Sequence, residues 1–366
     1  MKNKLESLQI LRGLAAFAVV LYHYNLYLVP NGPEREIPDK LFGWGAIGVD
    51  LFFVISGFIM VFVTADKVSG IKTSIDFIIN RLVRVLPTYY IILFLTIFCI
   101  GGIDLILNIN LDSDPNLASA LTFNPYIPET APLYIPDNGL YNIRWTLNYE
   151  IYFYLAFSIC LMFKPRIILL FFWFMIPIIF SIYSLHTFTL LTEGYNFESI
   201  KLRFITNPII LEFGVGILSG YAYRRLRHCD YLKHGLISIC LVVIIVTGIA
   251  LGALKAYSLL SALSFFFLVT LFSIQSDKII KFTPKVFVVL GDISFSWYLL
   301  HTPLLYIASL HFDKRFPGAI NSFYGFFGLL LLSIVLAWLS HRYIEVRLTN
   351  RIKHWIKSFP HIRKTI

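Results

Sequence analysis

Six ionisable side chains lie inside long apolar stretches of the chain, where a charge is costly and usually serves function. They are His23, Asp50, Glu150, Glu212, Asp292 and His301. His23 and Glu150 are the residue types that general acid–base catalysis needs, because His titrates near neutrality and a carboxylate fixes its tautomer. We therefore predict that His23 acts as a base and that Glu150 orients it and stabilises its protonated form.

The six groups differ in their depth within the apolar stretches. All except Asp292 lie about five residues from the outer end of their stretch, which places them roughly 8 Å below the outer boundary. Asp292 lies in the inner half. Asp50, Glu212 and Asp292 are equally well explained as buried polar groups that a neighbouring helix satisfies. His301 either positions an acceptor or makes an interhelical hydrogen bond.

Three arginines form a second group near the inner ends of the stretches. Arg12 and His23 share one face of a helix, about 16 Å apart along its axis. Arg81 and Arg84 precede the third stretch, with Pro87 in its first turn, so that we expect them at the positive end of a helix. Two guanidinium groups at a helix end suit a phosphate. For Arg81 alone, the ordinary enrichment of cations at cytoplasmic ends explains its position equally well.

A long molecule with a phosphorylated head and a reactive far end would connect the arginines with the His23–Glu150 pair. Acyl-CoA has that shape. A proton-coupled transporter of a glycan or lipid would place ionisable residues similarly. That alternative makes Asp50, Glu212 and Asp292 as important as the histidine and predicts no dependence on acetyl-CoA.

The composition indicates what kind of protein positions these groups. The chain has 366 residues, of which 57% are hydrophobic and only 14% charged, and its mean hydropathy is +0.73. Soluble domains carry about 25% charged residues. Soluble globular domains, disorder and coiled coils are therefore excluded, and an integral membrane protein is predicted. The net charge of +10 is explained by cationic cytoplasmic loops, so we expect no nucleic-acid partner.

Ten apolar stretches come near the roughly 20 residues that cross a bilayer as a helix. They lie at about 8–28, 45–64, 85–104, 145–163, 167–185, 207–223, 235–254, 256–275, 286–306 and 321–340. The predicted fold is an all-α polytopic membrane protein with about ten transmembrane helices. Most of the 31 Lys and Arg residues fall on one side when both termini are cytoplasmic, which is the orientation that the positive-inside rule favours.

The stretches define one membrane domain, residues 1–345, followed by a short basic cytoplasmic tail, residues 346–366. Residues 104–144 form a long outer loop with five prolines, and a loop of this length is usually functional or disordered. It could help to admit a substrate. The tail is typical of an interfacial helix on anionic lipid, so membrane lipids are expected partners.

Cysteine usage predicts neither a disulfide framework nor a metal site. The four cysteines occur singly, at Cys99, Cys160, Cys229 and Cys240. Their spacing matches no zinc motif. We expect no metal and no permanently bound cofactor.

Five motifs carry a resemblance that extends over nearly the whole chain. They are Leu11–Ala16 (LRGLAA) leading to His23, Gly48–Phe58 (GVDLFFVISGF), Arg81–Arg84 (RLVR), Trp145–Glu150 (WTLNYE) followed by Tyr152–Tyr154, and Ile293–His301 (ISFSWYLLH). In this order the sequence resembles the bacterial membrane acyltransferase-3 family, which O-acylates envelope and exported glycans. The fourth motif is most similar to the subset that acetylates exopolysaccharides and O-antigens.

The resemblance implies roles for several residues. Arg12 and His23 would serve acyl-CoA binding and catalysis, Arg81 and Arg84 would support the nucleotide end, and Glu150 would act near the reacting centre. Asp50, Trp145 and His301 are candidates for acceptor binding or support. The pair Ser56–Gly57 would allow close helix packing.

Two departures from the family pattern change what the resemblance implies. The proline that often follows Glu345 by two residues is Arg347 here, which argues against a role for Glu345. The chain also lacks the fused outer hydrolase-like domain of some members, so we expect it to act alone or with a separate partner.

The predicted function is that of a membrane O-acetyltransferase in the bacterial cytoplasmic (inner) membrane. Acetyl-CoA would be the donor substrate, bound from the cytoplasm, and a hydroxyl of an envelope or exported polysaccharide, or of its lipid-linked precursor, would be the acceptor. His23 would act as a base or be acetylated itself. A macrolide or another small molecule is an alternative acceptor. No oligomeric state is predicted.

Overall fold

The protein is described by a computed structural model that covers residues 5–29, 32, 35–107, 111, 114–136 and 142–358. All regular elements in these ranges are helices, which confirms the all-α prediction. The longer helices are α1 (Glu6–Leu28), α3 (Gly48–Thr64), α4 (Ile71–Leu107), α6 (Arg144–Leu161), α7 (Arg166–Leu185), α9 (Ile210–Leu226), α10 (Gly235–Ala250), α11 (Leu259–Ile274), α13 (Lys285–Ala308) and α14 (Phe323–Ser340). The shorter ones are α2 (Glu36–Phe42), α5 (Pro115–Thr122), α8 (Ile200–Thr206), α12 (Ser276–Phe282) and α15 (Arg347–Ser358).

Each of the ten apolar stretches overlaps one of the longer helices, as expected where backbone polar groups must be satisfied without water. In the described part of the chain, five helical segments are long and apolar enough to cross a membrane, or six if the bent pair α11–α12 is one span. The count of ten spans and the cytoplasmic position of both termini stay predictions. Residues 1–4 and the end of the predicted tail, 359–366, lie outside the described residues.

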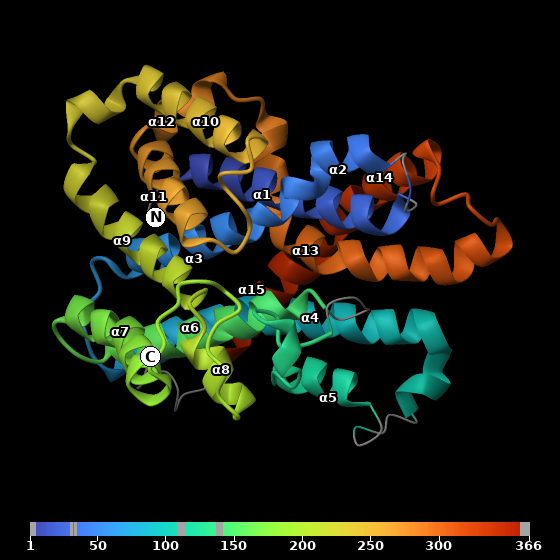
Figure 1. Cartoon of the computed structure of the whole chain (residues 1–366), viewed down its shortest axis with the longest axis horizontal. Coiled ribbons are helices and arrows are strands. Elements are labelled where there is room, and N and C mark those ends of the chain that lie inside the picture. The colour runs from blue at the N-terminus through green and yellow to red at the C-terminus, as the bar shows by residue number, and fades with distance from the viewer. Residues whose placement is uncertain are drawn as a thin grey trace.

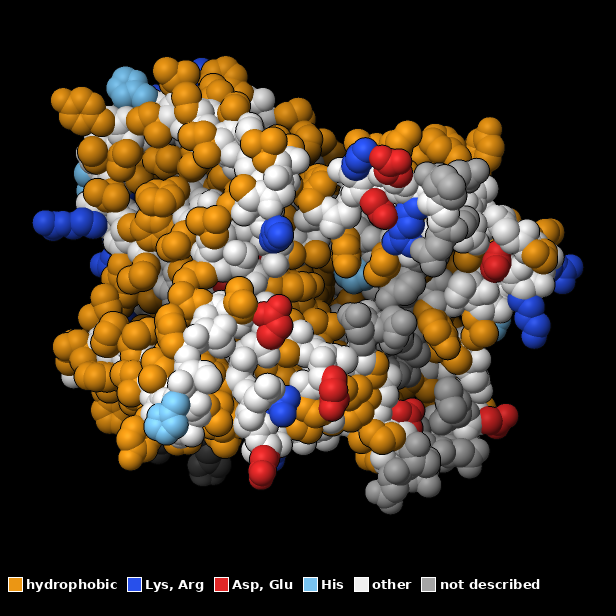
Figure 2. Space-filling model, in the orientation of Figure 1, with side chains coloured by type: hydrophobic (Ala, Val, Ile, Leu, Met, Phe, Trp, Pro, Cys, Tyr) orange, Lys and Arg blue, Asp and Glu red, His pale blue; other side chains and the backbone are white. Residues whose placement is uncertain are grey.

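The surface of the helices agrees with a membrane environment. Large hydrophobic side chains are exposed along α7, α10 and α14, including Phe171, Ile176, Val243 and Leu331. Figure 2 shows hydrophobic side chains over much of the face in view, with charged side chains scattered among them. A soluble monomer rarely exposes apolar patches of this extent. Together these features indicate a multi-pass membrane protein.

Two tightly packed helix pairs form the centre of the molecule: α1 with α13, and α3 with α9 (Figure 1). A Cβ atom on Gly57 of α3 would clash with the backbone of Phe213 on α9, and one on Gly291 of α13 would clash with the backbone of Gln9 on α1. Glycine therefore sets the separation of both pairs. This agrees with the packing role predicted for the Ser56–Gly57 pair.

Helix α4 begins earlier than the sequence predicts. It starts at Ile71 rather than near residue 85, so Arg81 and Arg84 lie inside the helix and not at its positive end. The sequence from residue 71 to 84 continues the helix, but its interspersed Lys, Thr, Ser, Asp, Asn and Arg residues interrupt the apolar signal. Pro87 has no N–H for the carbonyl of Val83. That carbonyl instead accepts a hydrogen bond from Thr349 Oγ1 of α15 at 3.3 Å, which joins the C-terminal helix to α4.

Much of the predicted outer loop packs against α4 and α6. Its residues 108–110, 112, 113 and 137–141 lie outside the described residues. The hydroxyls of Tyr89 and Tyr90 on α4 donate to the carbonyls of α5 at 2.8 Å each. The buried guanidinium of Arg144, at the start of α6, donates to Asn116 Oδ1 at 2.8 Å and to Ser119 Oγ at 3.1 Å. These bonds hold the loop against α4 and the start of α6.

Candidate functional site

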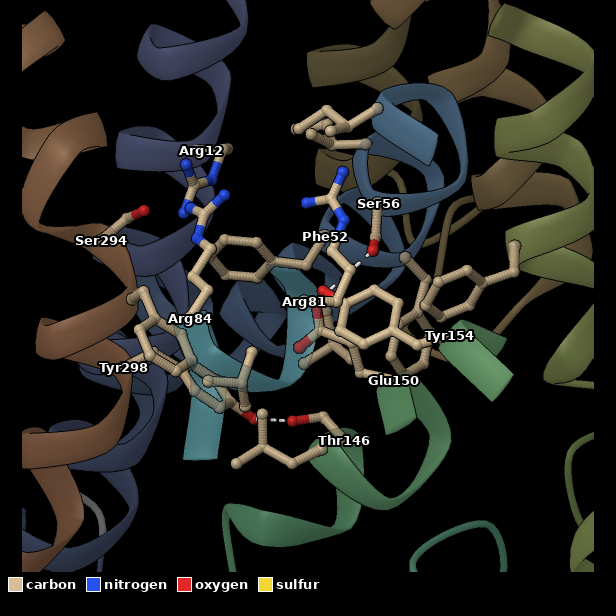
Figure 3. A pocket seen from close by; sticks show the side chains of 18 residues that line it. Arg12, Phe52, Ser56, Arg81, Arg84, Thr146, Glu150, Tyr154, Ser294 and Tyr298 are labelled. Atoms are coloured by element: carbon tan, nitrogen blue, oxygen red, sulfur yellow. Dashed lines mark hydrogen bonds between the residues drawn. The ribbon is translucent and has the colours of Figure 1, made fainter. Parts of the chain in front are cut away.

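The three predicted arginines line one pocket. This arginine pocket encloses about 780 Å³ of open space and is lined by residues of α1, α3, α4, α6, α9 and α13. Arg12 comes from α1, and Arg81 and Arg84 from α4. Figure 3 shows Arg12 and Arg84 reaching into the pocket beside each other, with Ser56 and Glu150 on the opposite side. The structure thus brings together cations that are far apart in the sequence.

The arginine side chains are held by neighbours within the pocket. Arg12 Nη1 donates to Gln9 Oε1 at 3.0 Å. The guanidinium of Arg81 lies 5.5 Å from the ring centroid of Phe77 and 5.7 Å from that of Tyr154, which is cation–π geometry. Three guanidinium groups face one lining carboxylate, so the pocket carries a net positive charge and suits a phosphate-bearing ligand.

Glu150 is the lining carboxylate of the arginine pocket. Its Oε1 atom accepts hydrogen bonds from Ser56 Oγ at 3.5 Å and from the hydroxyl of Tyr154. Tyr154 lies one helical turn further along α6, and Ser56 lies on α3. The carboxylate is therefore fixed by two hydroxyl groups and faces the cations of α1 and α4.

His23 lines a second pocket. This histidine pocket encloses about 1100 Å³ of open space, and Tyr22, Trp145 and Tyr257 contribute to its wall. Trp145 and Tyr257 meet edge to face, with ring centroids 5.4 Å apart. The predicted outer loop also contributes, through Leu133 among others. The pocket therefore combines aromatic faces with polar groups and lies beneath the loop.

His301 is the hydrogen-bonding partner of His23 in the structure. His301 Nδ1 lies 2.6 Å from the carbonyl of Tyr298, which can only accept, so Nδ1 carries the proton and Nε2 of the neutral ring accepts. His301 Nε2 lies 3.1 Å from His23 Nδ1, which in turn is 3.0 Å from the carbonyl of Val19. His23 Nδ1 must therefore carry its proton, and Nε2 is the basic nitrogen of His23.

This arrangement differs from the predicted His23–Glu150 pair. The two residues line different pockets, and the Val19 carbonyl and a histidine, rather than a carboxylate, fix the tautomer of His23. Depth along a helix places groups on one level, but the rotation of each helix decides which groups face each other. His301 was predicted either to position an acceptor or to make an interhelical hydrogen bond. The structure shows the hydrogen bond, and the His301 ring on α13 is fully buried.

Tyr298 and Val49 line both pockets and separate them. The Tyr298 hydroxyl lies 3.0 Å from Thr146 Oγ1, and its ring meets Phe52 edge to face at 5.8 Å between centroids. Sequence reasoning did not single out Tyr298. Its position three residues before His301 was the available signal, because residues at i and i+3 share a helix face.

Asp50 supports the histidine pocket through hydrogen bonds to the backbone of Tyr257, which lines it. Its buried carboxylate accepts hydrogen bonds from the backbone N–H groups of Tyr257 and Ser258 at 3.0 and 2.9 Å. These bonds hold Tyr257 at a φ of 58°, in the left-handed region. Asp50 lines neither described pocket and acts through Tyr257. Glu212 is buried near Asp50 on α9, and Asp292 is half-buried near the start of α13.

Glu345 has more contacts than the sequence suggested. It is buried, and its Oε2 atom accepts from Ser296 Oγ and His341 Nδ1 at 3.0 Å each. It also interacts electrostatically with Arg84 and Arg12. Glu345 therefore joins the segment that follows α14 to α13, close to the arginines of the pocket.

Comparisons with known proteins agree on one kind of enzyme. The model of the acyltransferase-3 family, described as an acyltransferase domain, matches residues 5–342. A relative, the exopolysaccharide production protein ExoZ of Rhizobium meliloti (strain 1021), is 28% identical over 263 residues, which is 70% of this chain and 76% of the relative. No solved structure matches the chain.

Proposed function

Because the chain belongs to the acyltransferase-3 family and is an acyltransferase, we propose that it moves an acetyl group from acetyl-CoA in the arginine pocket to a glycan hydroxyl in the histidine pocket. The acceptor is an exopolysaccharide or its lipid-linked precursor. The observation that carries this proposal is the contact between a cationic pocket and a histidine pocket across Tyr298. The exopolysaccharide acceptor is supported by the printed name of the relative.

The arginine pocket has the features that a coenzyme A donor needs. Its three guanidinium groups suit the phosphates, and the aromatic and aliphatic lining between them and Tyr298 suits the pantetheine arm. Arg12 and His23 are about 16 Å apart along α1. A donor held by its phosphates at Arg12 and Arg84 would therefore direct its thioester towards Tyr298 and His23.

His23 is the general base of the proposed reaction. Its Nε2 takes the proton of the acceptor hydroxyl while the hydroxyl oxygen attacks the thioester carbonyl carbon. The tetrahedral intermediate collapses and the carbon–sulfur bond breaks. The coenzyme A thiolate then takes the proton from the His23 imidazolium. His301 and the Val19 carbonyl keep the proton of His23 on Nδ1, which leaves Nε2 as the basic nitrogen of the ring.

The histidine pocket suits a sugar ring. Trp145 and Tyr257 offer aromatic faces for the carbon–hydrogen side of a pyranose, while polar groups in the same wall suit its hydroxyls. Among its described residues, the predicted outer loop lines this pocket, through Leu133 and Asn142, and does not line the arginine pocket. With the positive-inside orientation, donor and acceptor approach from opposite sides of the bacterial cytoplasmic membrane.

The proposal is tested on the surface and secreted polysaccharide of a deletion strain complemented with wild-type or His23→Ala protein. Acetyl ester signals should vanish on deletion and return only with the wild type. Esters that return with His23→Ala would contradict the role of the base. Unchanged acetylation of the polysaccharide after deletion would instead point to a small-molecule acceptor such as a macrolide.

A labelling experiment distinguishes general base catalysis by His23 from a mechanism in which His23 is acetylated. Purified wild-type protein is incubated with radiolabelled acetyl-CoA in the absence of acceptor. General base catalysis leaves no labelled protein after acid quenching. A labelled chain that requires His23 would show instead that this histidine is itself acetylated.

A further inference from the structure

A third pocket lies at the C-terminal end of α3, between the turn that joins α6 to α7 and the helix α9. It encloses about 820 Å³ of open space. Four cations line it: Lys67, Lys164, Arg166 and Arg224. No carboxylate is among its described lining residues. We call it the basic pocket, and it lies on the side of the membrane that is predicted to be cytoplasmic.

Hydrogen bonds to backbone carbonyls and to one hydroxyl hold the two arginines of the basic pocket in place. Arg166 donates through Nε to Ser69 Oγ at 2.8 Å, through Nη1 to the carbonyl of Thr64 at 3.0 Å, and through Nη2 to the carbonyl of Lys67. Arg224 Nη1 donates to the carbonyl of Ala65 at 2.9 Å. These carbonyls end α3, where cations are favoured. A guanidinium has five N–H donors, so each arginine keeps donors for a ligand.

The charge of the basic pocket is only partly balanced by protein groups. Asp66 lies 3.7 Å from Arg224 Nη2, and the two side chains are 70% and 41% exposed. Such an exposed ion pair contributes little. Four cations close together repel one another, and an anionic ligand would remove that repulsion. The pocket thus has donors, charge and space for an anion.

The inner wall of the basic pocket is apolar. The buried side chains of Val61 and Phe157 form it, the exposed Ile167 extends the apolar lining, and Tyr221 adds a hydroxyl. Basic pockets between membrane helices on the cytoplasmic side are suited to lipid phosphate groups, whose acyl chains need such a wall. We propose that the basic pocket is a second anion site of this enzyme and that it binds a phosphate ester.

Two molecules could supply the phosphate ester. One is an anionic glycerophospholipid, whose headgroup would enter from the membrane surface. The other is the nucleotide end of the donor, which rests on the proposed function. The arginine pocket and the basic pocket are neighbours along α6. Tyr154 lines the arginine pocket, and Phe157, about 5 Å further along the helix axis, lines the basic pocket. They share no described lining residue.

The test compares two triple variants of the full chain with equal loss of charge. Lys67→Gln, Lys164→Gln and Arg224→Gln remove cations of the basic pocket. The matched control, Arg225→Gln, Lys233→Gln and Lys281→Gln, removes exposed cations on the same predicted side of the membrane. Arg225 directly follows Arg224 on α9 and lies outside the pocket lining.

Two probes distinguish the sources. Retention of phosphatidylglycerol by protein in phosphatidylcholine nanodiscs is measured by native mass spectrometry, and binding of adenosine 3′,5′-bisphosphate by equilibrium dialysis. The pocket variant should bind one probe about tenfold more weakly than the wild type, while the control stays within about twofold. Loss of phosphatidylglycerol identifies a lipid site, and loss of the bisphosphate identifies the donor nucleotide.

The proposal is overturned if both probes bind the pocket variant as they bind the control. Thermal unfolding midpoints establish that both variants fold. The single variant Lys164→Gln, at an exposed turn, repeats the comparison against Lys281→Gln if the triple variant does not accumulate. Arg81→Gln removes a cation of the arginine pocket and leaves the basic pocket intact. Bisphosphate binding that is lost in Arg81→Gln but kept in the basic-pocket variants would mean that the arginine pocket binds the donor nucleotide. In that case the basic pocket is not the nucleotide site, and the proposed function still stands.

Discussion

The arginine pocket and the histidine pocket meet at Tyr298 but differ in how they hold their ionisable groups. In the arginine pocket, long cationic side chains from α1 and α4 surround a small space, and one carboxylate, Glu150, is fixed by two hydroxyls. In the histidine pocket, the Val19 carbonyl and a second, fully buried histidine set the tautomer of His23. The first arrangement suits recognition of charge, and the second suits transfer of a proton.

This difference indicates a division of labour along α1, which carries Arg12 near one end and His23 near the other. Changes in the arginine pocket should affect donor binding, and changes in the histidine pocket should affect the chemical step. Steady-state kinetics separate these effects, because KM alone changes when ground state and transition state lose the same interaction.

The largest effect is expected for His23→Ala. Loss of a general base costs about 100- to 10,000-fold in rate, so kcat should fall by that factor while acetyl-CoA binding stays near the wild-type value. Radiolabelled acetyl transfer to purified polysaccharide measures kcat, and equilibrium dialysis measures donor binding. If His23→Ala lowered kcat and acetyl-CoA binding by the same factor, the two pockets would not have separate roles.

Arg84→Gln should have the opposite pattern. A hydrogen bond to a charged group contributes about 1.5–3 kcal/mol, so KM for acetyl-CoA should rise about tenfold to 100-fold with kcat near the wild-type value. The exposed Arg225→Gln on α9 is the matched control. A fall in kcat without a change in KM would show that Arg84 acts in the chemical step and not in donor binding.

His301 is expected to act as a positioning residue. His301→Leu removes one of the two acceptors of His23 Nδ1–H and leaves the Val19 carbonyl, so kcat should fall about tenfold, the cost of one strong hydrogen bond. His301→Gln offers an amide oxygen to the same N–H and should recover part of the rate. Equal rates for the Leu and Gln variants would mean that the bond between the two histidines does not matter.

The smallest effect is expected for Tyr298→Phe, which removes the hydroxyl that lies 3.0 Å from Thr146 Oγ1. A neutral hydrogen bond contributes about 0.5–1.5 kcal/mol, so kcat should change by about two- to tenfold and the ring should still separate the pockets. Thr146→Val removes the same bond from the other side. The double variant should therefore cost no more than either single one, and additive losses would contradict a direct bond.

The sequence predicted the helices well because a long apolar stretch favours a helix, whose backbone polar groups are satisfied internally. It failed at the start of α4, where residues 71–84 are polar enough to hide a helix that continues beyond the apolar stretch. The family resemblance and the assignment as an acyltransferase are confirmed by the comparisons.

Side-chain partners were harder to predict. The predicted common depth of His23 and Glu150 suggested a pair, but the rotation of α6 turns Glu150 towards Arg12, and His23 bonds to His301 instead. The basic pocket was missed because Lys67, Lys164 and Arg224 come from three separate segments, and only the fold brings them together.

The central claim is that the acetyl group passes from a donor on one side to an acceptor on the other. Proteoliposomes with oriented protein test it directly, when radiolabelled acetyl-CoA is supplied only on the side of the arginine pocket and polysaccharide only on the opposite side. Label should appear as acetyl esters on the polysaccharide with the wild type and not with His23→Ala. Transfer that occurs only when donor and acceptor share one side would contradict the account.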